Sequence, residues 1–327
     1  MASTTLHTAQ PPHPVMPKAL PPATPAALNP PPSAAFPYEF FENVTRVSFR
    51  PRDTDLNLPN AWWLMEAAFL SYSAPATIAA VYAKPPLSAT VTCFSGPLNT
   101  QCYVASTDEW IVLAFRGTQV DDIGPSLVDW SVDARFLPVP DSHRDWVHAG
   151  FLNAIHDVWS DVVAYISGLQ AEVPRALWVA GHSLGAALAT VATNLLCADH
   201  VDGLGIRGLY TYGSPRTGDG GFGKRITVPV WRFRNNTDLV TNVPIGLVFR
   251  HVGQLAFIDS GGVLHRNVGR AQERVLDAGG VRLSAREAHD LAGLLESAGS
   301  HLALPGFIAD HAPINYAIRI WNCLEAS

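Results

Sequence analysis

The sequence predicts an α/β fold, in which a mostly parallel β-sheet carries helices on both faces. The main observation is alternation: short apolar segments of strand character are followed by longer segments whose apolar residues recur at helical spacing. Composition agrees, because 48% of the 327 residues are hydrophobic and only 15% are charged, which allows a sizeable core. No internal repeat is evident along the chain.

The first part of the predicted domain combines one helical region with three strands. A helix is expected over 60–83, broken near Pro75, and residues 89–95 and 101–106 have the pattern of a hairpin. Residues 110–115, WIVLAF, are apolar throughout, which predicts a strand buried on both faces.

The remainder of the chain alternates strands and helices in the manner of parallel βαβ units. Helices are predicted over 151–169, 183–197, 286–298 and 311–321, and strands over 176–180, 209–213, 228–234 and 247–252.

The N-terminal region has a different composition from the rest of the chain. Residues 1–37 hold 11 of the 26 prolines, a density that prevents helices and central strands. We expect a disordered or polyproline-like leader there and a single folded domain over 38–327.

Charge and composition exclude several classes of function. The 22 Lys and Arg residues against 28 Asp and Glu residues give a net charge of −6 without a basic stripe, which argues against a nucleic-acid partner. No run reaches the roughly 18 apolar residues of a membrane-spanning helix, and the N-terminus lacks the pattern of a secretory signal. A cytoplasmic location is therefore favoured, with secretion by another route left open.

The four cysteines form neither a disulfide framework nor a CxxC pair, so no structural metal site is expected. Cys93 and Cys102 are equidistant from the centre of the predicted hairpin and would face each other in a symmetric one. A disulfide there and two buried thiols are both open.

The strongest chemical signal is the GxSxG sequence GHSLG at residues 181–185. It follows the apolar strand ALWVA directly and opens an alanine-rich helix, which is the strand–turn–helix setting of a nucleophile elbow. The two glycines are needed because side chains there would collide with the neighbouring strand and helix. Ser183 is therefore the candidate nucleophile, and it needs a base held by a carboxylate.

Asp238 is the preferred acid, because it follows the strand VPVWRF at the edge of the sheet where α/β proteins place function. The rivals Asp199 and Asp202 end the elbow helix, and Asp259 and Asp277 lie in turn-like stretches.

Five histidines follow Asp238 and compete for the role of base. His251 lies in a strand-like segment, where a packed core histidine is the better interpretation. His265 falls in a Gly-rich hairpin, and His289 and His301 lie on or just past a predicted helix. His311 precedes the last helix on a loop that suits a catalytic base, but spacing alone leaves the choice open.

Two backbone N–H groups are expected to bind the oxyanion. One is that of Leu184, directly after the nucleophile. The other should come from the loop after an early central strand, and FRGT at 115–118 fits, with Gly117 allowing close approach and Thr118 offering its N–H.

Taken together, these motifs resemble the fungal-type class 3 lipase family over roughly residues 60–320. The resemblance rests on an ordered set: AFRGT at 114–118, Asp129-Trp130, HAGF at 148–151, VAGHSLGAALA at 179–189, TYGSPRTGD at 211–219, NTDLVTNVP at 236–244, HVG at 251–253, and Asp310-His311 with Tyr316.

The resemblance implies an α/β-hydrolase fold and a role for individual residues. The pattern serine falls on Ser183, the acid on Asp238, the late Asp-His pattern on His311, and the oxyanion residue on Thr118. A lid is implied directly after the oxyanion loop, over 119–130. Its two adjacent acids and a Gly-Pro step break a regular helix, which leaves a preference for soluble esters open.

The implied function is that of a serine carboxyl-ester hydrolase of the triacylglycerol lipase type, acting on acylglycerols or other esters at a lipid–water interface without a cofactor or metal. A short-chain or aryl carboxylesterase and a phospholipase A1 are alternatives with the same mechanism. An inactive, lipase-like binding domain is disfavoured, because every member of the triad has a candidate.

Overall fold

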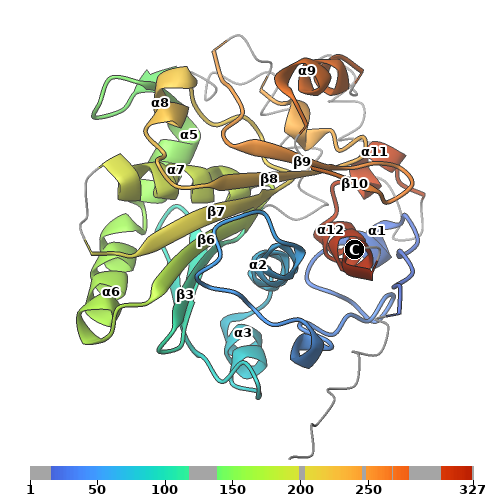
Figure 1. Cartoon of the computed structure of the whole chain (residues 1–327), viewed down its shortest axis with the longest axis horizontal. Coiled ribbons are helices and arrows are strands. Elements are labelled where there is room, and N and C mark those ends of the chain that lie inside the picture. The colour runs from blue at the N-terminus through green and yellow to red at the C-terminus, as the bar shows by residue number, and fades with distance from the viewer. Residues whose placement is uncertain are drawn as a thin grey trace, which may run out of the picture.

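A mixed sheet in the order β1-β2-β3-β6-β7-β8-β9-β10 runs through the centre of the molecule (Figure 1). The computed structural model describes residues 16–117, 138–198, 203–244, 248–266, 268–279 and 303–325. The lid predicted over 119–130 and the helix predicted over 286–298 lie outside these ranges.

Five adjacent strands, from β3 to β9, are parallel, and antiparallel strands flank them on both edges. The predicted mostly parallel sheet is thus confirmed. The strands of this sheet are β1 (Thr90–Ser95), β2 (Gln101–Ser106), β3 (Trp110–Phe115), β6 (Ala176–His182), β7 (Ile206–Tyr212), β8 (Val230–Asn235), β9 (Gln254–Ile258) and β10 (Leu264–His265). A separate two-stranded ribbon consists of β4 (Pro138–Pro140) and β5 (Trp146–His148).

Helices cover both faces of the sheet (Figure 1). One face carries α2 (Leu58–Leu70), α3 (Pro75–Tyr82) and α12 (Pro313–Glu325). The other carries α5 (Ala149–His156), α6 (Trp159–Glu172) and α7 (Leu184–Ala198). The shorter helices are α1 (Pro25–Leu28), α8 (Gly220–Lys224), α9 (Arg270–Gly279) and α11 (Gly306–Ala309), with 3₁₀ turns at Val44–Arg46 and Val240–Asn242.

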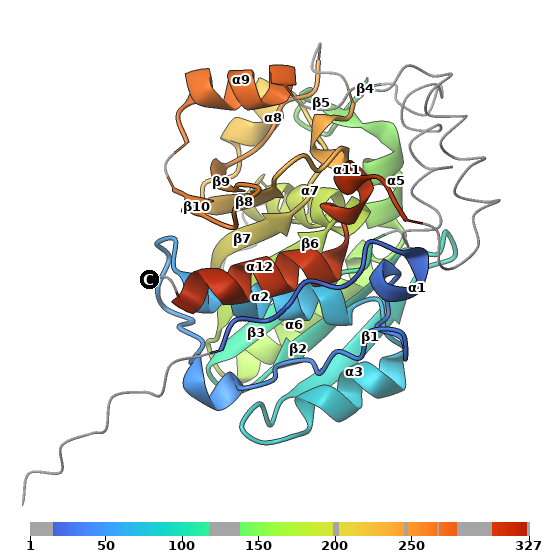
Figure 2. The same ribbon diagram turned by 90° about the vertical axis from the view of Figure 1, so that its right-hand side faces the viewer.

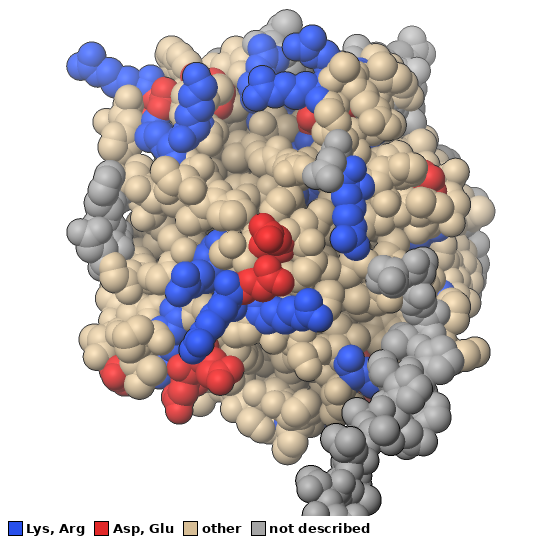
Figure 3. All heavy atoms as spheres, in the orientation of Figure 1, with Lys and Arg blue, Asp and Glu red and all other residues tan. Residues whose placement is uncertain are grey.

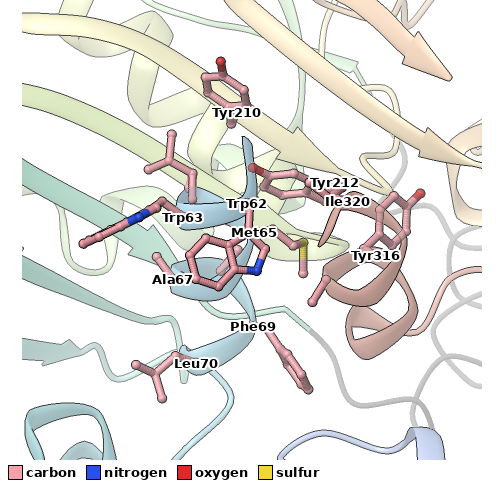
Figure 4. Close-up of a cluster of buried hydrophobic side chains, with 14 of the residues drawn as sticks. Trp62, Trp63, Met65, Ala67, Phe69, Leu70, Tyr210, Tyr212, Tyr316 and Ile320 are labelled. Carbon is pink, nitrogen blue, oxygen red and sulfur yellow. The ribbon is translucent and has the colours of Figure 1, made fainter. Parts of the chain in front are cut away.

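Helix α2 is buried along nearly its whole length, because it lies between the sheet and α12 (Figure 2). Its first turn is capped by the Asn57 side chain, which accepts a hydrogen bond from the Asn60 N–H at 2.8 Å. The tryptophans of α2 meet tyrosines of β7 and residues of α12 in one aromatic cluster (Figure 4). The rings of Trp62 and Trp321 lie 5.1 Å apart. This layer fixes α12 against the sheet.

Two predicted elements differ from the structure. The helix expected over 151–169 is interrupted at Asp157 and Val158, where the Asp157 carboxylate accepts the Leu98 N–H at 2.8 Å and so ties this turn to the β1–β2 loop. The prediction of a strand over 247–252 was wrong over its described residues, 248–252. The strand begins at Gln254, after Gly253 turns the chain with φ +86°, and both apolar runs around this glycine have strand character in sequence.

The cysteines of the hairpin are not bridged. The register pairs Cys93 with Tyr103 and Cys102 with Phe94, because five residues rather than four separate β1 from β2. The two thiols are therefore displaced by one residue and point to opposite faces of the sheet, and both are free.

The described part of the proline-rich leader, residues 16–37, packs on the domain. Asn322 of α12 holds the Lys18 backbone by two hydrogen bonds, at 2.8 Å to the N–H and 3.0 Å to the carbonyl. Further on, Leu304 donates its N–H to Ala23 at 2.7 Å, and Leu28 is buried in the main apolar cluster. Proline prevents regular structure here but not packing of an extended chain.

Candidate active site

Ser183 occupies a tight turn between β6 and α7. Its φ of +58° lies in the left-handed region, which a non-glycine residue adopts only under constraint. The constraint is local: a Cβ on Gly181 would collide with the Gly185 carbonyl, and a Cβ on Gly185 would collide with that of Phe115. The Ser183 N–H also donates to Tyr212 at 2.9 Å. The predicted elbow geometry is therefore present.

The structure brings Ser183, His311 and Asp238 together in one buried chain of hydrogen bonds. His311 Nε2 lies 2.8 Å from Ser183 Oγ, and His311 Nδ1 lies 2.9 Å and 3.0 Å from the two carboxylate oxygens of Asp238. All three side chains are fully buried. Because β6 and β8 are parallel, the residues that follow them meet at the same edge of the sheet.

Asp238 is held in the ionised form by its neighbours. Burial by itself raises the pKa of this carboxyl, but the charge and hydrogen bond of His311 and the hydroxyl of Tyr316 outweigh burial and leave the pKa below its ordinary value. Tyr316 donates to Asp238 Oδ2 at 2.6 Å, and the Val240 N–H donates to Oδ1 at 2.9 Å. Three donors thus orient the carboxylate, with the His311 ring N–H shared between its two oxygens, and the carboxylate stays an acceptor.

Gly213, which follows β7, leaves the space that Asp238 and His311 occupy. Its φ is +59°, and a Cβ there would lie 2.7 Å from Asp238 Oδ2 and 3.0 Å from His311 Nδ1. Only glycine fits at this position without moving the pair.

Asp310 joins the loop of His311 to the loop of Asp238, a role that sequence reasoning did not assign. Its carboxylate accepts from the Thr237 N–H and hydroxyl, at 3.1 Å and 2.7 Å, and from the Asn236 amide at 2.9 Å. Its carbonyl accepts from the Asn235 amide at 2.9 Å. The adjacency of Asp310 to His311 and of Thr237 to Asp238 was the available signal.

The described rival residues are engaged elsewhere. Asp259 pairs with His265 at 2.7 Å on the β9–β10 hairpin. Asp277 pairs with Arg216 and Arg234. Burial, first, and the charges of Arg232, Arg216 and Arg234 hold the pKa of His251 well below its usual value. The remaining rivals, Asp199, Asp202, His289 and His301, lie outside the described residues.

Of the predicted oxyanion donors, the structure describes one. Leu184 begins α7, and the first N–H groups of a helix have no acceptor within it. Gly117 ends the described stretch after β3, and Thr118 lies just outside the described residues. In the parts of the chain that are described, no group of three His, Cys, Asp or Glu residues could hold a metal, and no helix is long and apolar enough to cross a membrane.

A mostly parallel sheet with a serine on a strand–turn–helix elbow, followed in chain order by an acid and a histidine that meet it, defines an α/β-hydrolase. Within that class, residues 112–247 match the sequence model described as Lipase (class 3). The resemblance to the class 3 lipase family seen in the motifs is thus confirmed over these residues.

Individual lipases are also similar to this chain in sequence and structure. A lipase of Rhizomucor miehei is 33% identical over 171 residues, which cover 48% of this chain and 44% of the relative. A secreted mono- and diacylglycerol lipase A of Penicillium cyclopium is 33% identical over 170 residues, covering 50% and 53%. The chain thus spans about half the length of these curated relatives. The solved structure of the Rhizomucor miehei triacylglyceride lipase superposes with a TM-score of 0.52 at 26% identity, over 62% of this chain and 80% of that one.

Proposed function

We propose that this protein is a serine carboxyl-ester hydrolase that cleaves acylglycerols, with Ser183 as nucleophile, His311 as base and Asp238 as the orienting acid. The observation that carries the proposal is the 2.8 Å approach of His311 Nε2 to Ser183 Oγ on the strained elbow. A serine hydroxyl is a weak nucleophile, and a base at this distance is what activates it.

The geometry supports a two-step reaction. Ser183 Oγ attacks the ester carbonyl while its proton passes to His311 Nε2, and Asp238 stabilises the imidazolium through Nδ1. The N–H of Leu184 binds the oxyanion, together with that of Thr118 as the family motif implies. His311 then protonates the departing alcohol, and the acyl-enzyme is hydrolysed by a water that gives its proton to the same nitrogen.

The substrate class is supported by the names of the relatives, which include a triacylglyceride lipase and a mono- and diacylglycerol lipase. Esters of glycerol with one, two and three acyl chains are therefore the substrates to compare. The same residues would act on them all, since the chemistry is confined to the carbonyl and its leaving oxygen.

The test is release of free acid from emulsified tri-, di- and monoacylglycerols and from soluble p-nitrophenyl butyrate. Ser183→Ala should reduce kcat by more than about 10⁴-fold on every substrate that the wild type cleaves. Ser106→Ala is a matched control, because Ser106 is also buried but hydrogen-bonds Thr90 at 3.1 Å, away from His311. Its activity should stay within about twofold of wild type.

The outcomes separate mechanism from substrate. Full activity in Ser183→Ala would contradict the mechanism. Cleavage of the butyrate ester alone, abolished in Ser183→Ala, would keep the mechanism and replace acylglycerols by short-chain esters.

A further inference from the structure

His182, the residue before the nucleophile, is a buried histidine to which the mechanism above gives no role. Its Nδ1 lies 2.8 Å from the hydroxyl of Tyr72, and its Nε2 lies 2.7 Å from the backbone carbonyl of His311. The rings of His182 and His311 are 4.7 Å apart between centroids. One side chain thus connects the end of α2 to the main chain of the base.

The direction of both hydrogen bonds follows from the acceptor. A carbonyl oxygen only accepts, so Nε2 of His182 carries the hydrogen and donates it to His311. In a neutral imidazole Nδ1 is then an acceptor, and the Tyr72 hydroxyl is its donor. Burial, first, and the neighbouring His311 hold the pKa of His182 well below its usual value, so the ring stays neutral.

An uncharged His182 ring is compatible with the proposed role of His311. During the reaction His311 becomes a cation, and a second cation within van der Waals reach would oppose that step. A neutral His182 instead holds the His311 backbone without competing for the proton. Burial also raises the pKa of Tyr72, so its hydroxyl keeps the hydrogen that it donates.

Tyr72 connects this pair to the strand that precedes the oxyanion loop. A Cβ on Gly117 would collide with the Tyr72 hydroxyl and with the His182 carbonyl, so the Gly117 backbone packs directly on both residues. Ser71, which precedes Tyr72, donates its hydroxyl to the Ala68 carbonyl at 2.7 Å, and the same hydroxyl lies 3.3 Å from the Phe115 carbonyl. The same contacts therefore fix the end of β3 and the elbow relative to each other.

We propose that His182 and Tyr72 are positioning residues that hold three segments in register: the His311 main chain, the Ser183 elbow and the backbone at Gly117. Neither side chain touches the reacting atoms, and the inference rests on the proposed function. A displacement of about 1 Å between reacting groups costs on the order of 10²-fold in rate, so register at this level affects kcat.

The test compares variants on soluble p-nitrophenyl butyrate. His182→Phe keeps a ring but removes both hydrogen bonds, and we expect kcat to fall about 10- to 100-fold with KM within about twofold. His182→Gln retains a donor and an acceptor and should recover most of the loss. Tyr72→Phe should lower kcat about three- to tenfold, since it leaves the bond to His311 in place.

Tyr103→Phe is the matched control. Its hydroxyl is also buried and donates to the Ala67 carbonyl of α2 at 2.8 Å, but it does not contact the elbow. Its kcat should equal that of wild type even if its thermal stability falls as far as that of Tyr72→Phe.

Several results would overturn the inference. Wild-type kcat in folded His182→Phe, a change confined to KM, or an equal loss in Tyr103→Phe would each do so. If His182→Phe does not fold, wild-type kcat in Tyr72→Phe overturns it. Failure of the proposed function is distinguished by Ser183→Ala, because hydrolysis that survives in that variant removes the reaction which His182 is said to support.

Discussion

Helices α12 and α9 both come from the last third of the chain, yet they are attached to the molecule by opposite means. Helix α12 buries apolar side chains, among them Ile314, Ile318 and Trp321, against α2 and the sheet. Helix α9 buries none of its residues. Its acids instead pair with buried arginines that extend from β8 and the loop after β7: Glu273 with Arg232, and Asp277 with Arg234 at 3.1 Å and Arg216 at 3.0 Å.

The two kinds of attachment support the candidate site in different ways. Helix α12 positions Tyr316, whose hydroxyl donates to Asp238. Because apolar packing holds this helix in place, salt does not weaken its attachment. The ion pairs of α9 reach the same neighbourhood from the other side, since Arg216 donates to the carbonyls of Asn242 and Pro244 at 2.6 Å and 2.9 Å. Lys and Arg side chains gather at the top of Figure 3, where α8 and α9 lie in Figure 1.

The largest expected effect is on the apolar side of the comparison. Trp321→Ala removes a ring that is 1% exposed and packed on Trp62, and should lower the free energy of unfolding by about 3–5 kcal/mol. Chemical denaturation measures this. Val275→Ala on α9 is the control, because Val275 is 70% exposed and should change stability by less than about 0.5 kcal/mol. Equal losses in the two variants would abolish the contrast.

One acid in the apolar layer around α2 should make the stability of this layer depend on pH. Glu66 of α2 is fully buried beside the Tyr38 hydroxyl, and burial raises its pKa to about 7. The folded state therefore holds a proton that the unfolded state releases near pH 4.5, so the contribution of Glu66 to stability should fall as pH rises from about 4.5 to 7.

The expected fall attributable to Glu66 is on the order of 3 kcal/mol. Glu66→Gln should remove this part of the pH dependence, which denaturation curves at several pH values would reveal. An unchanged slope in Glu66→Gln would mean that the carboxylate is ionised in the folded protein.

A smaller effect is expected from the ion pairs of α9. Glu273→Gln leaves the Arg232 guanidinium buried without its charged partner and should destabilise the protein by about 1–2 kcal/mol, less than for a fully buried pair because Glu273 is partly exposed. The double variant Arg232→Met/Glu273→Gln should recover stability, since no uncompensated charge remains. A double variant weaker than Glu273→Gln would show that the pair itself is net stabilising.

The smallest effect is expected from salt. Raising NaCl from about 0.05 M to 1 M shortens the screening length from over 10 Å to about 3 Å, which weakens the attachment of α9. Amide hydrogen exchange should become a few-fold faster in α9 and stay unchanged in α12. Faster exchange in both helices would indicate global destabilisation rather than release of α9.

The sequence predicts the sheet and the elbow well, because both are encoded locally. The run WIVLAF and the GHSLG turn carry their own strand and elbow signals, and both appear where expected. The choice of His311 among five histidines needed the family resemblance, since only the folded chain shows which loop returns to Ser183. The one-residue shift of the β1–β2 register, which separates Cys93 from Cys102, depends on loop geometry that spacing does not determine.

The contact of Tyr72 with His182 also depends on the fold and could not be foreseen from the sequence. Tyr72 follows α2, 110 residues before His182 in the chain, and nothing in its local sequence distinguishes it from a core tyrosine. The packed part of the leader is a further case, because its hydrogen bonds to α12 join residues more than 300 positions apart.

Gly213 gives the site a requirement that chemistry alone does not suggest. Its absent side chain is the space that Asp238 and His311 share. In a library that randomises each position in turn and selects for hydrolysis, position 213 should therefore tolerate as few substitutions as position 183, although it contributes no functional group. Such a selection would then identify Gly213 as essential because it lacks a side chain, and not because it takes part in the reaction.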